Sequence, residues 1–104
     1  MSQDLKAESR WRSAVCDTEV VVVRAPSEPA QLECGGTSML PVGSDPEHGS
    51  SPDPRWSDGT LIGKRYELGA PAIEILCTKA GAGSLSIGGV PLTVKGSKPL
   101  PASD

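Results

Sequence analysis

The sequence of 104 residues contains no phenylalanine, and aromatic residues make up only 3% of it. A hydrophobic core must therefore be built from Val, Leu, Ile and Met, and so thin a core usually needs help from a metal ion, a second copy or a partner subunit. Lys and Arg form no cluster, and the net charge is -3. These features argue against nucleic acid and an acidic membrane surface as partners. No apolar run approaches the roughly 20 residues that cross a bilayer.

Histidine is almost absent as well. The single one, His48, lies in a segment rich in Gly, Ser, Asp and Pro. A mechanism that pairs a Ser or Cys nucleophile with histidine would have to use it, although catalytic groups need rigid surroundings. The glycine-rich segments lack the Lys and the helix start of a phosphate-binding loop. The sequence therefore predicts a protein without an active site of its own.

The redox state expected of the three cysteines, Cys16, Cys34 and Cys77, depends on the cellular compartment of the protein. Residues 1–12 are polar and mixed in charge, which is typical neither of a signal peptide nor of a transit peptide. We therefore expect a cytoplasmic location, where thiols are kept reduced.

Short segments rich in β-branched and apolar residues predict an all-β fold. The clearest is Glu19–Arg24, with the sequence EVVVVR. Glycine and proline separate it from the other apolar segments. These cover residues 31–34, 39–42, 61–68, 72–78, 84–87 and 90–95.

When the sequence is shifted by 53 positions against itself, its first part matches its second part without gaps. Residues 20–23 then fall on 73–76, Leu32 falls on Leu85, and the Gly-Gly pair at 35–36 falls on the pair at 88–89. Each part is too small to bury its apolar face alone, so we expect the two to pack as a pseudo-twofold unit. The predicted organisation is a first repeat with an N-terminal extension (1–42), a linker (43–60), a second repeat (61–95) and an extended tail (96–104).

The repeat resembles a known family. The segment WRSAVC at residues 11–16, the valine-rich segment 20–23 and the segment LECGGTSM at residues 32–39 are similar to desulforedoxin and to the N-terminal domain of desulfoferrodoxin. That family combines an aromatic residue, a C-x-x-C knuckle, a Val-rich strand, a Gly-rich turn and an L-x-C-C-G-x-x-M segment, and its four thiolates hold one iron or zinc. The resemblance covers residues 10–42 and, more faintly, 64–95. It implies two small desulforedoxin-like β repeats in one chain.

The family's metal ligands are only partly present. Ser13 stands where the first cysteine would be and Gly35 where the fourth would be, which leaves Cys16 and Cys34. None of the four remains in the second repeat. Two thiolates do not complete a tetrahedral site, so we expect no cofactor.

Other uses of the cysteines stay open. Cys16, Cys34, Cys77 and His48 would together make a Cys₃His zinc site. Cys16 and Cys34 alone would hold zinc or iron if Ser13, water or a second chain completed the site, or they would form a redox disulfide. The simplest interpretation is that Cys34 and Cys77 are small buried hydrophobic residues.

The leading hypothesis is a non-catalytic accessory or scaffold subunit that binds a larger intracellular protein or enzyme complex. It rests on the lost ligands, the thin core, Trp56 in the linker and the Pro-containing tail with Leu100. Trp56 and Leu100 are the predicted partner-binding residues. The alternative is a small metal-binding or thiol-redox protein that uses Cys16 and Cys34. Assembly into a homo-oligomer is left open.

Overall fold

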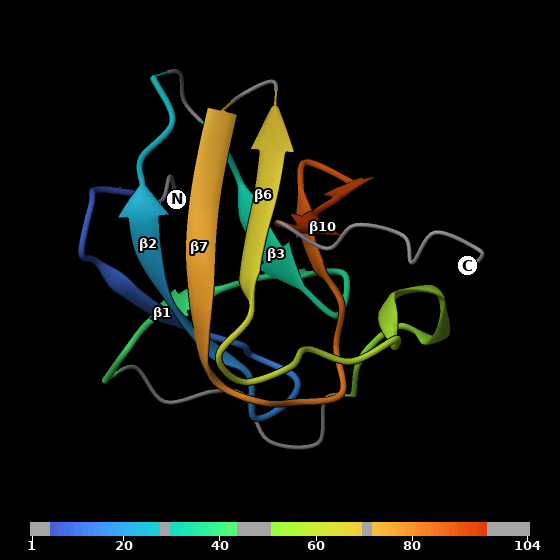
Figure 1. The fold of residues 1–104 in the computed structure, drawn as a ribbon. Coiled ribbons are helices and arrows are strands. Elements are labelled where there is room, and N and C mark those ends of the chain that lie inside the picture. The colour runs from blue at the N-terminus through green and yellow to red at the C-terminus, as the bar shows by residue number, and fades with distance from the viewer. Residues whose placement is uncertain (1–4, 28–29, 44–50, 70–71, 96–104) are drawn as a thin grey trace, which may run out of the picture.

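The computed structural model describes residues 5–27, 30–43, 51–69 and 72–95. These residues form two antiparallel β-sheets that face each other (Figure 1), and the all-β prediction is confirmed. Within the described residues, no helix is long and apolar enough to cross a membrane.

The larger sheet has six strands in the order β10-β6-β7-β2-β1-β5. Their bounds are Thr93–Val94, Arg65–Gly69, Ala72–Lys79, Glu19–Arg24, Arg10–Arg12 and Leu40–Pro41, in the same order. The smaller sheet has four strands in the order β4-β3-β8-β9. Their bounds are Thr37–Ser38, Leu32–Cys34, Leu85–Ile87 and Val90–Pro91.

The central strand pair of each sheet joins the two parts of the chain. β2 pairs with β7, with Val22 opposite Ile75, and β3 pairs with β8, with Glu33 opposite Ser86. Both pairs of facing residues are 53 positions apart, the shift that relates the predicted repeats. This register supports the internal repeat, which stays a prediction.

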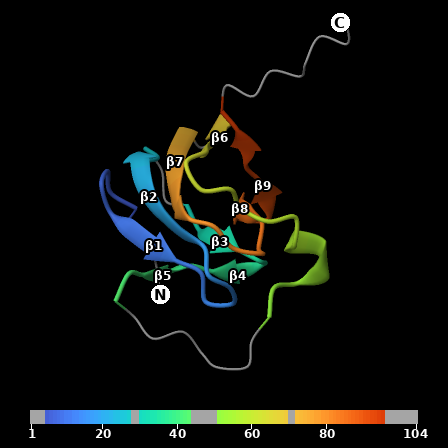
Figure 2. The ribbon, with the colours of Figure 1, turned by 60° about the horizontal axis from the view of Figure 1, so that its bottom comes forward.

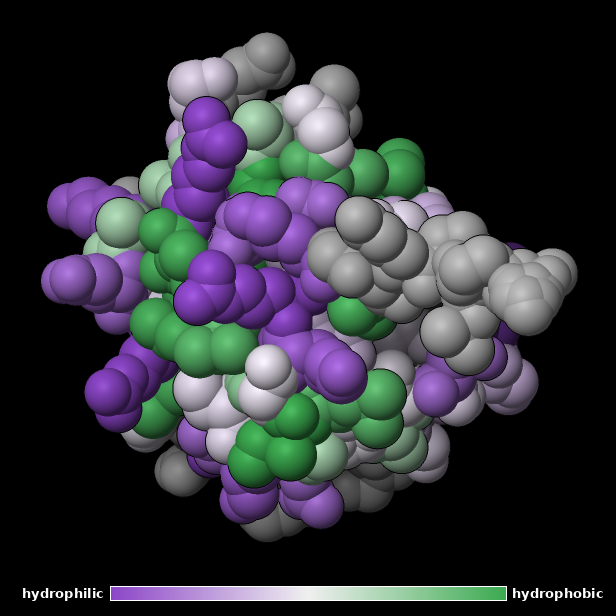
Figure 3. Space-filling model, viewed as in Figure 1, coloured by the Kyte–Doolittle hydropathy of each residue, from purple (hydrophilic) through white to green (hydrophobic). Residues whose placement is uncertain are grey.

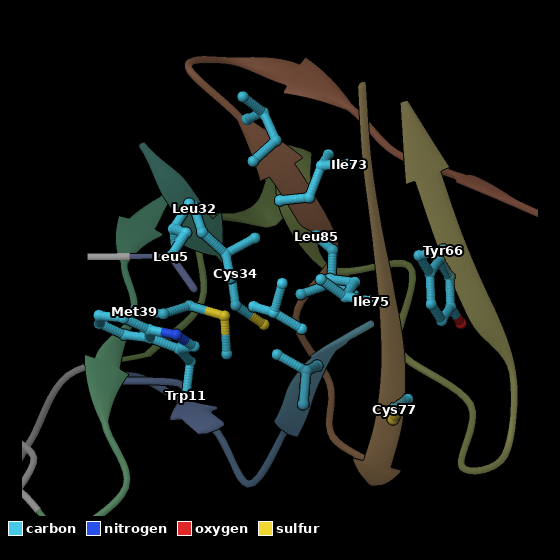
Figure 4. Close-up of a cluster of buried hydrophobic side chains, with 13 residues drawn as sticks. Leu5, Trp11, Leu32, Cys34, Met39, Tyr66, Ile73, Ile75, Cys77 and Leu85 are labelled. Carbon is cyan, nitrogen blue, oxygen red and sulfur yellow. The ribbon is translucent and has the colours of Figure 1, made fainter. Parts of the chain in front are cut away.

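The core lies between the two sheets and contains no large aromatic cluster. Its fully buried members include Leu32, Met39, Ile75, Val20 and Val22, and Trp11 is also buried. Figure 4 shows Leu32, Cys34 and Leu85 on the side of the smaller sheet and Ile75 on that of the larger one. Alternate residues of β2 are buried, as expected for a strand with one face on a core.

Two strand predictions are corrected by the structure. Residues 61–64 precede β6 as an exposed turn, because Lys64 N donates to Leu61 O and Gly63 has φ +81°. Leu61 and Ile62 are consequently 59% and 65% exposed. The segment predicted as one strand over residues 90–95 is divided into β9 and β10.

The predicted linker contains ordered structure. Residues Pro54–Trp56 form a short 3-10 helix, η1, capped by Asp53, whose carboxylate accepts from Arg55 N at 2.9 Å. η1 lies beside the smaller sheet (Figure 2), where Ser84 N donates to Trp56 O at 2.7 Å and Asp53 N donates to Gly35 O at 2.9 Å.

Figure 3 shows hydrophilic side chains gathered at the centre of the outer face of the larger sheet, with hydrophobic side chains around them. Glu74 points outward from β7 between Lys95 Nζ at 2.6 Å and Arg65 Nη1 at 3.3 Å. The two cations lower the pKa of Glu74, with the Lys95 contact as the largest cause. This ion-pair group ties β6, β7 and the end of β10 together.

Candidate functional site

Cys16 and Cys34 meet at one end of the space between the sheets. Their sulfur atoms lie 3.7 Å apart, and neither cysteine takes part in a disulfide. Cys34 ends β3 and is 0% exposed, whereas Cys16 is half-buried in the turn between β1 and β2. The two side chains thus form a sulfur pair with one accessible member.

The turn that carries Cys16 is built around Ser13. Ser13 Oγ accepts from Val15 N and from Cys16 N, each at 3.1 Å. Ser13 N donates to Thr18 O at 2.8 Å, which closes the turn. Both Ser13 and Thr18 are 0% exposed. The fixed turn holds Cys16 Sγ toward Cys34.

Hydrogen-bond donors surround the Cys16 sulfur. Gly83 N donates to Cys16 Sγ at 3.4 Å. The Cys16 thiol donates to Thr18 Oγ1 at 3.3 Å, and when the sulfur is ionised this hydroxyl becomes the donor. An ionised sulfur accepts from all these groups and from the Cys34 thiol. The turn therefore stabilises a thiolate at Cys16.

The pKa values of the pair move in opposite directions. The pKa of Cys16 falls from 9.0 to about 4, chiefly because the Cys34 thiol donates to its sulfur. Burial opposes this effect, and the hydroxyls of Ser13 and Thr18 add to it. The pKa of Cys34 is raised by the same hydrogen bond and by burial. The geometry thus favours a thiolate at Cys16 and a protonated thiol at Cys34.

A glycine-containing loop, residues 80–83, packs directly against the sulfur pair. A Cβ atom at Gly81 would lie 2.3 Å from Thr18 Oγ1, and one at Gly83 would lie 3.0 Å from Cys34 Sγ. Because no side chain fits there, the loop backbone approaches close enough for the Gly83 amide to reach Cys16.

The residues present do not fit the iron or zinc site that the resemblance implies. A closed tetrahedral site needs four ligands, and in the described parts of the chain no three His, Cys, Asp or Glu side chains gather closely enough to hold a metal ion. Figure 4 shows Cys77 on β7, well apart from Cys34. Its thiol donates to Lys79 O at 3.2 Å, and burial raises its pKa. His48 lies outside the described residues.

Trp56 is half-buried, and its ring covers the turn between β3 and β4. A Cβ at Gly36 would lie 3.1 Å from Trp56 Cδ1. Trp56 also lines a groove of about 500 Å³ between η1, β6 and the segment 84–94. Tyr66, Leu61, Leu85 and Leu92 line it as well. The other predicted partner-binding residue, Leu100, lies outside the described residues.

Sequence reasoning missed the donors around Cys16. The spacing of Ser13, Cys16 and Thr18 is visible in the sequence and, with hindsight, indicates a turn in which hydroxyls face a sulfur. The Gly83 amide gives no such local signal, because it is 67 positions away from Cys16.

Comparisons of the chain with protein-family models, with curated proteins and with solved structures find no match.

Proposed function

We propose that this chain is a thiol-redox protein in which Cys16 and Cys34 alternate between the dithiol and the disulfide. The observation that carries the proposal is the 3.7 Å contact between the sulfur atoms of half-buried Cys16 and buried Cys34, in surroundings that favour a thiolate at Cys16. A thiolate is the reactive form of cysteine, and donors around it make its reactivity selective.

The chemistry needs a small movement only. A disulfide bond is about 2.05 Å long, so the two sulfur atoms must approach by about 1.7 Å. In exchange with an external disulfide, Cys16 attacks one sulfur and releases the other as a thiolate. Cys34 then loses its proton, attacks the Cys16 sulfur and releases the second thiol. Two electrons pass from the pair to the external disulfide.

The test is a titration of the purified chain in glutathione buffers of increasing potential, followed by intact mass. We expect a reversible loss of two hydrogen atoms that disappears in Cys16→Ser and in Cys34→Ser. Cys77→Ser provides the matched control, because Cys77 is buried on β7 and its thiol contacts Lys79 O instead of the pair. No reversible loss in the unsubstituted chain, either in the glutathione buffers or with hydrogen peroxide followed by dithiothreitol, would contradict the proposal.

A second proposal is that the chain acts as an accessory subunit without an active site of its own and binds a larger protein through the groove beside Trp56. It is supported by the apolar side chains that line part of the groove, among them the exposed Leu61, and by Ile62, which follows Leu61 in the chain and is exposed. We expect Trp56→Ala to weaken binding of the co-purifying partner while the thermal unfolding midpoint stays high. Native mass spectrometry of gently purified protein is the measurement, and unchanged binding in this variant contradicts the idea.

We also propose that the fold is a tandem of degenerate desulforedoxin-like repeats. The support is the register of the central strands. The shift of 53 positions makes Leu32 equivalent to Leu85 and Cys34 equivalent to Ile87. In the pair of β3 with β8, Leu32 faces Ile87 and Cys34 faces Leu85, so the two strands face each other through equivalent positions. The proposal includes the cytoplasmic location, because a reducing compartment would regenerate the dithiol. Superposition of residues 11–42 on 64–95 in an experimental structure tests the repeat.

A further inference from the structure

The two members of the sulfur pair are unequal in access. Cys34 is 0% exposed, and its sulfur is covered by the backbone of Gly83, where a Cβ would come within 3.0 Å. Cys16 is half-buried. An oxidant from solvent therefore meets the Cys16 sulfur first, and Cys34 acts second.

The surroundings of Cys16 are tight. Thr18 and Gly83, which contact its sulfur, and Ser13, which accepts from its backbone amide, are all buried. To attack an external disulfide, the Cys16 sulfur must approach one of its sulfur atoms along the S–S axis, and each of those two sulfur atoms carries a further chain. The groove of about 500 Å³ offers no such approach, because neither cysteine is among its lining residues. The site is better suited to an oxidant of a few atoms.

The donors at Cys16 also match the charge movement of a peroxide reaction. When a thiolate attacks a peroxide, negative charge moves from sulfur to the leaving oxygen. The Gly83 amide points to the sulfur at 3.4 Å, and the Thr18 hydroxyl lies 3.3 Å from it. Both groups would donate to an oxygen that arrives beside an ionised Cys16 sulfur. Donors placed where charge develops stabilise a transition state.

From this geometry we propose that the oxidant of the pair is a small hydroperoxide, with Cys16 as the attacking sulfur and Cys34 as the resolving sulfur. The proposal rests on the redox function proposed above. Cys16 attacks the terminal oxygen, the O–O bond breaks, and the leaving alkoxide or hydroxide takes the Cys34 proton and departs as alcohol or water. The Cys34 sulfur then attacks the Cys16 sulfenic acid, the S–S bond forms, and hydroxide leaves as water after taking a proton from solvent.

The size of the expected rate follows from two opposing effects. At pH 7 a thiol with a pKa of about 4 is fully ionised, and its thiolate fraction is about a hundredfold larger than that of a thiol with a pKa of 9.0. The lower basicity of such a thiolate reduces its nucleophilicity by a similar factor. If Cys16 reacts with a hydroperoxide much faster than free cysteine does, the difference must therefore come from the hydrogen-bond donors placed at its sulfur.

The experiment uses the reduced full chain with Cys77→Ser, hydrogen peroxide as the probe, and quenched intact-mass measurements at pH 7. We expect disulfide formation at least about tenfold faster than oxidation of free cysteine. In Cys34→Ser we expect a sulfenic acid on Cys16 that dimedone traps, and in Cys16→Ser no fast reaction. If Cys34→Ser fails to fold, peptide mapping of the partly oxidised chain locates the first oxidised sulfur.

Oxidised glutathione separates the two proposals. If it forms the disulfide while hydrogen peroxide reacts no faster than with free cysteine, the hydroperoxide inference is overturned and the redox function stands. If neither forms a reversible disulfide, both are overturned. Sulfenic acid on Cys34 before Cys16 also overturns the assignment of roles.

Discussion

Replacing Thr18 by Val exchanges the hydroxyl beside the Cys16 sulfur for a methyl group, and it therefore tests whether this hydroxyl stabilises the thiolate. The Thr18 hydroxyl lies 3.3 Å from Cys16 Sγ and is one of the groups that lower the Cys16 pKa. A hydrogen bond to a charged group contributes about 1.5–3 kcal/mol. One pKa unit corresponds to about 1.36 kcal/mol, so Thr18→Val raises the Cys16 pKa by about one to two units, from about 4 to about 5–6.

The assay is the alkylation rate of Cys16 with iodoacetamide as a function of pH, with the alkylated residue identified by mass. The two proteins should differ most between about pH 4 and pH 6 and should converge at pH 7, where both are ionised. Thr93→Val is the matched control, because its hydroxyl contacts Glu67 O at 3.4 Å on β6, at the other edge of the larger sheet. A midpoint that does not rise in Thr18→Val refutes the role of the hydroxyl.

The same variant has a signature in stability. The folded pKa of Cys16 lies below its ordinary value of 9.0, so the stability that its thiolate contributes is full above that pH. It is lost as the pH falls toward about 4, where the folded protein also binds the proton. In Thr18→Val this loss is complete at a pH about one to two units higher. Urea midpoints measured from pH 4 to pH 8 record the difference.

Three further predictions concern the pair, the ion-pair group and the loop. Cys34→Ala removes the donor that lowers the Cys16 pKa most, so this pKa rises, while Cys34→Ser keeps a donor and gives a smaller rise in the same alkylation assay. Glu74→Gln lowers the urea midpoint at pH 7, and the difference from the unsubstituted chain shrinks as the pH falls, because a carboxyl with a lowered pKa contributes stability above its unfolded pKa and loses it in acid. Gly81→Ala destabilises by about 1–3 kcal/mol in urea unfolding, since its Cβ would meet the backbone of Thr18 at 2.4 Å, whereas Gly69→Ala, with open space, changes stability by less than about 0.5 kcal/mol.

Local composition was enough to predict some strands and not others. The valines of β2 predict a strand by themselves, and their alternate burial follows from the pleat. β1, with the sequence RWR, gives no such signal and becomes a strand because it pairs with β2 and β5. Residues 61–64 are apolar enough for a strand, but the positive φ of Gly63 turns the chain first.

The candidate site was predictable in its two sulfur atoms and not in its chemistry. The resemblance brought Cys16 and Cys34 together because both stand at ligand positions of the family. What distinguishes the site is the Gly83 amide, which depends on the loop after β7 reaching across to the turn after β1. Such a contact follows from the packing of two distant segments, which no window of sequence contains.

Because β2 pairs with β7 and β3 pairs with β8, each sheet needs strands from both parts of the chain, and neither part contains a complete sheet by itself. A fragment that ends before η1 would expose the hydrogen-bonding edges of two central strands at once. Such edges recruit any strand of suitable register, and the best one available belongs to the other fragment. The protein is therefore suited to division in the segment 43–53, with two separately expressed fragments that recover the fold, and the sulfur pair with its Gly83 contact, only when they meet.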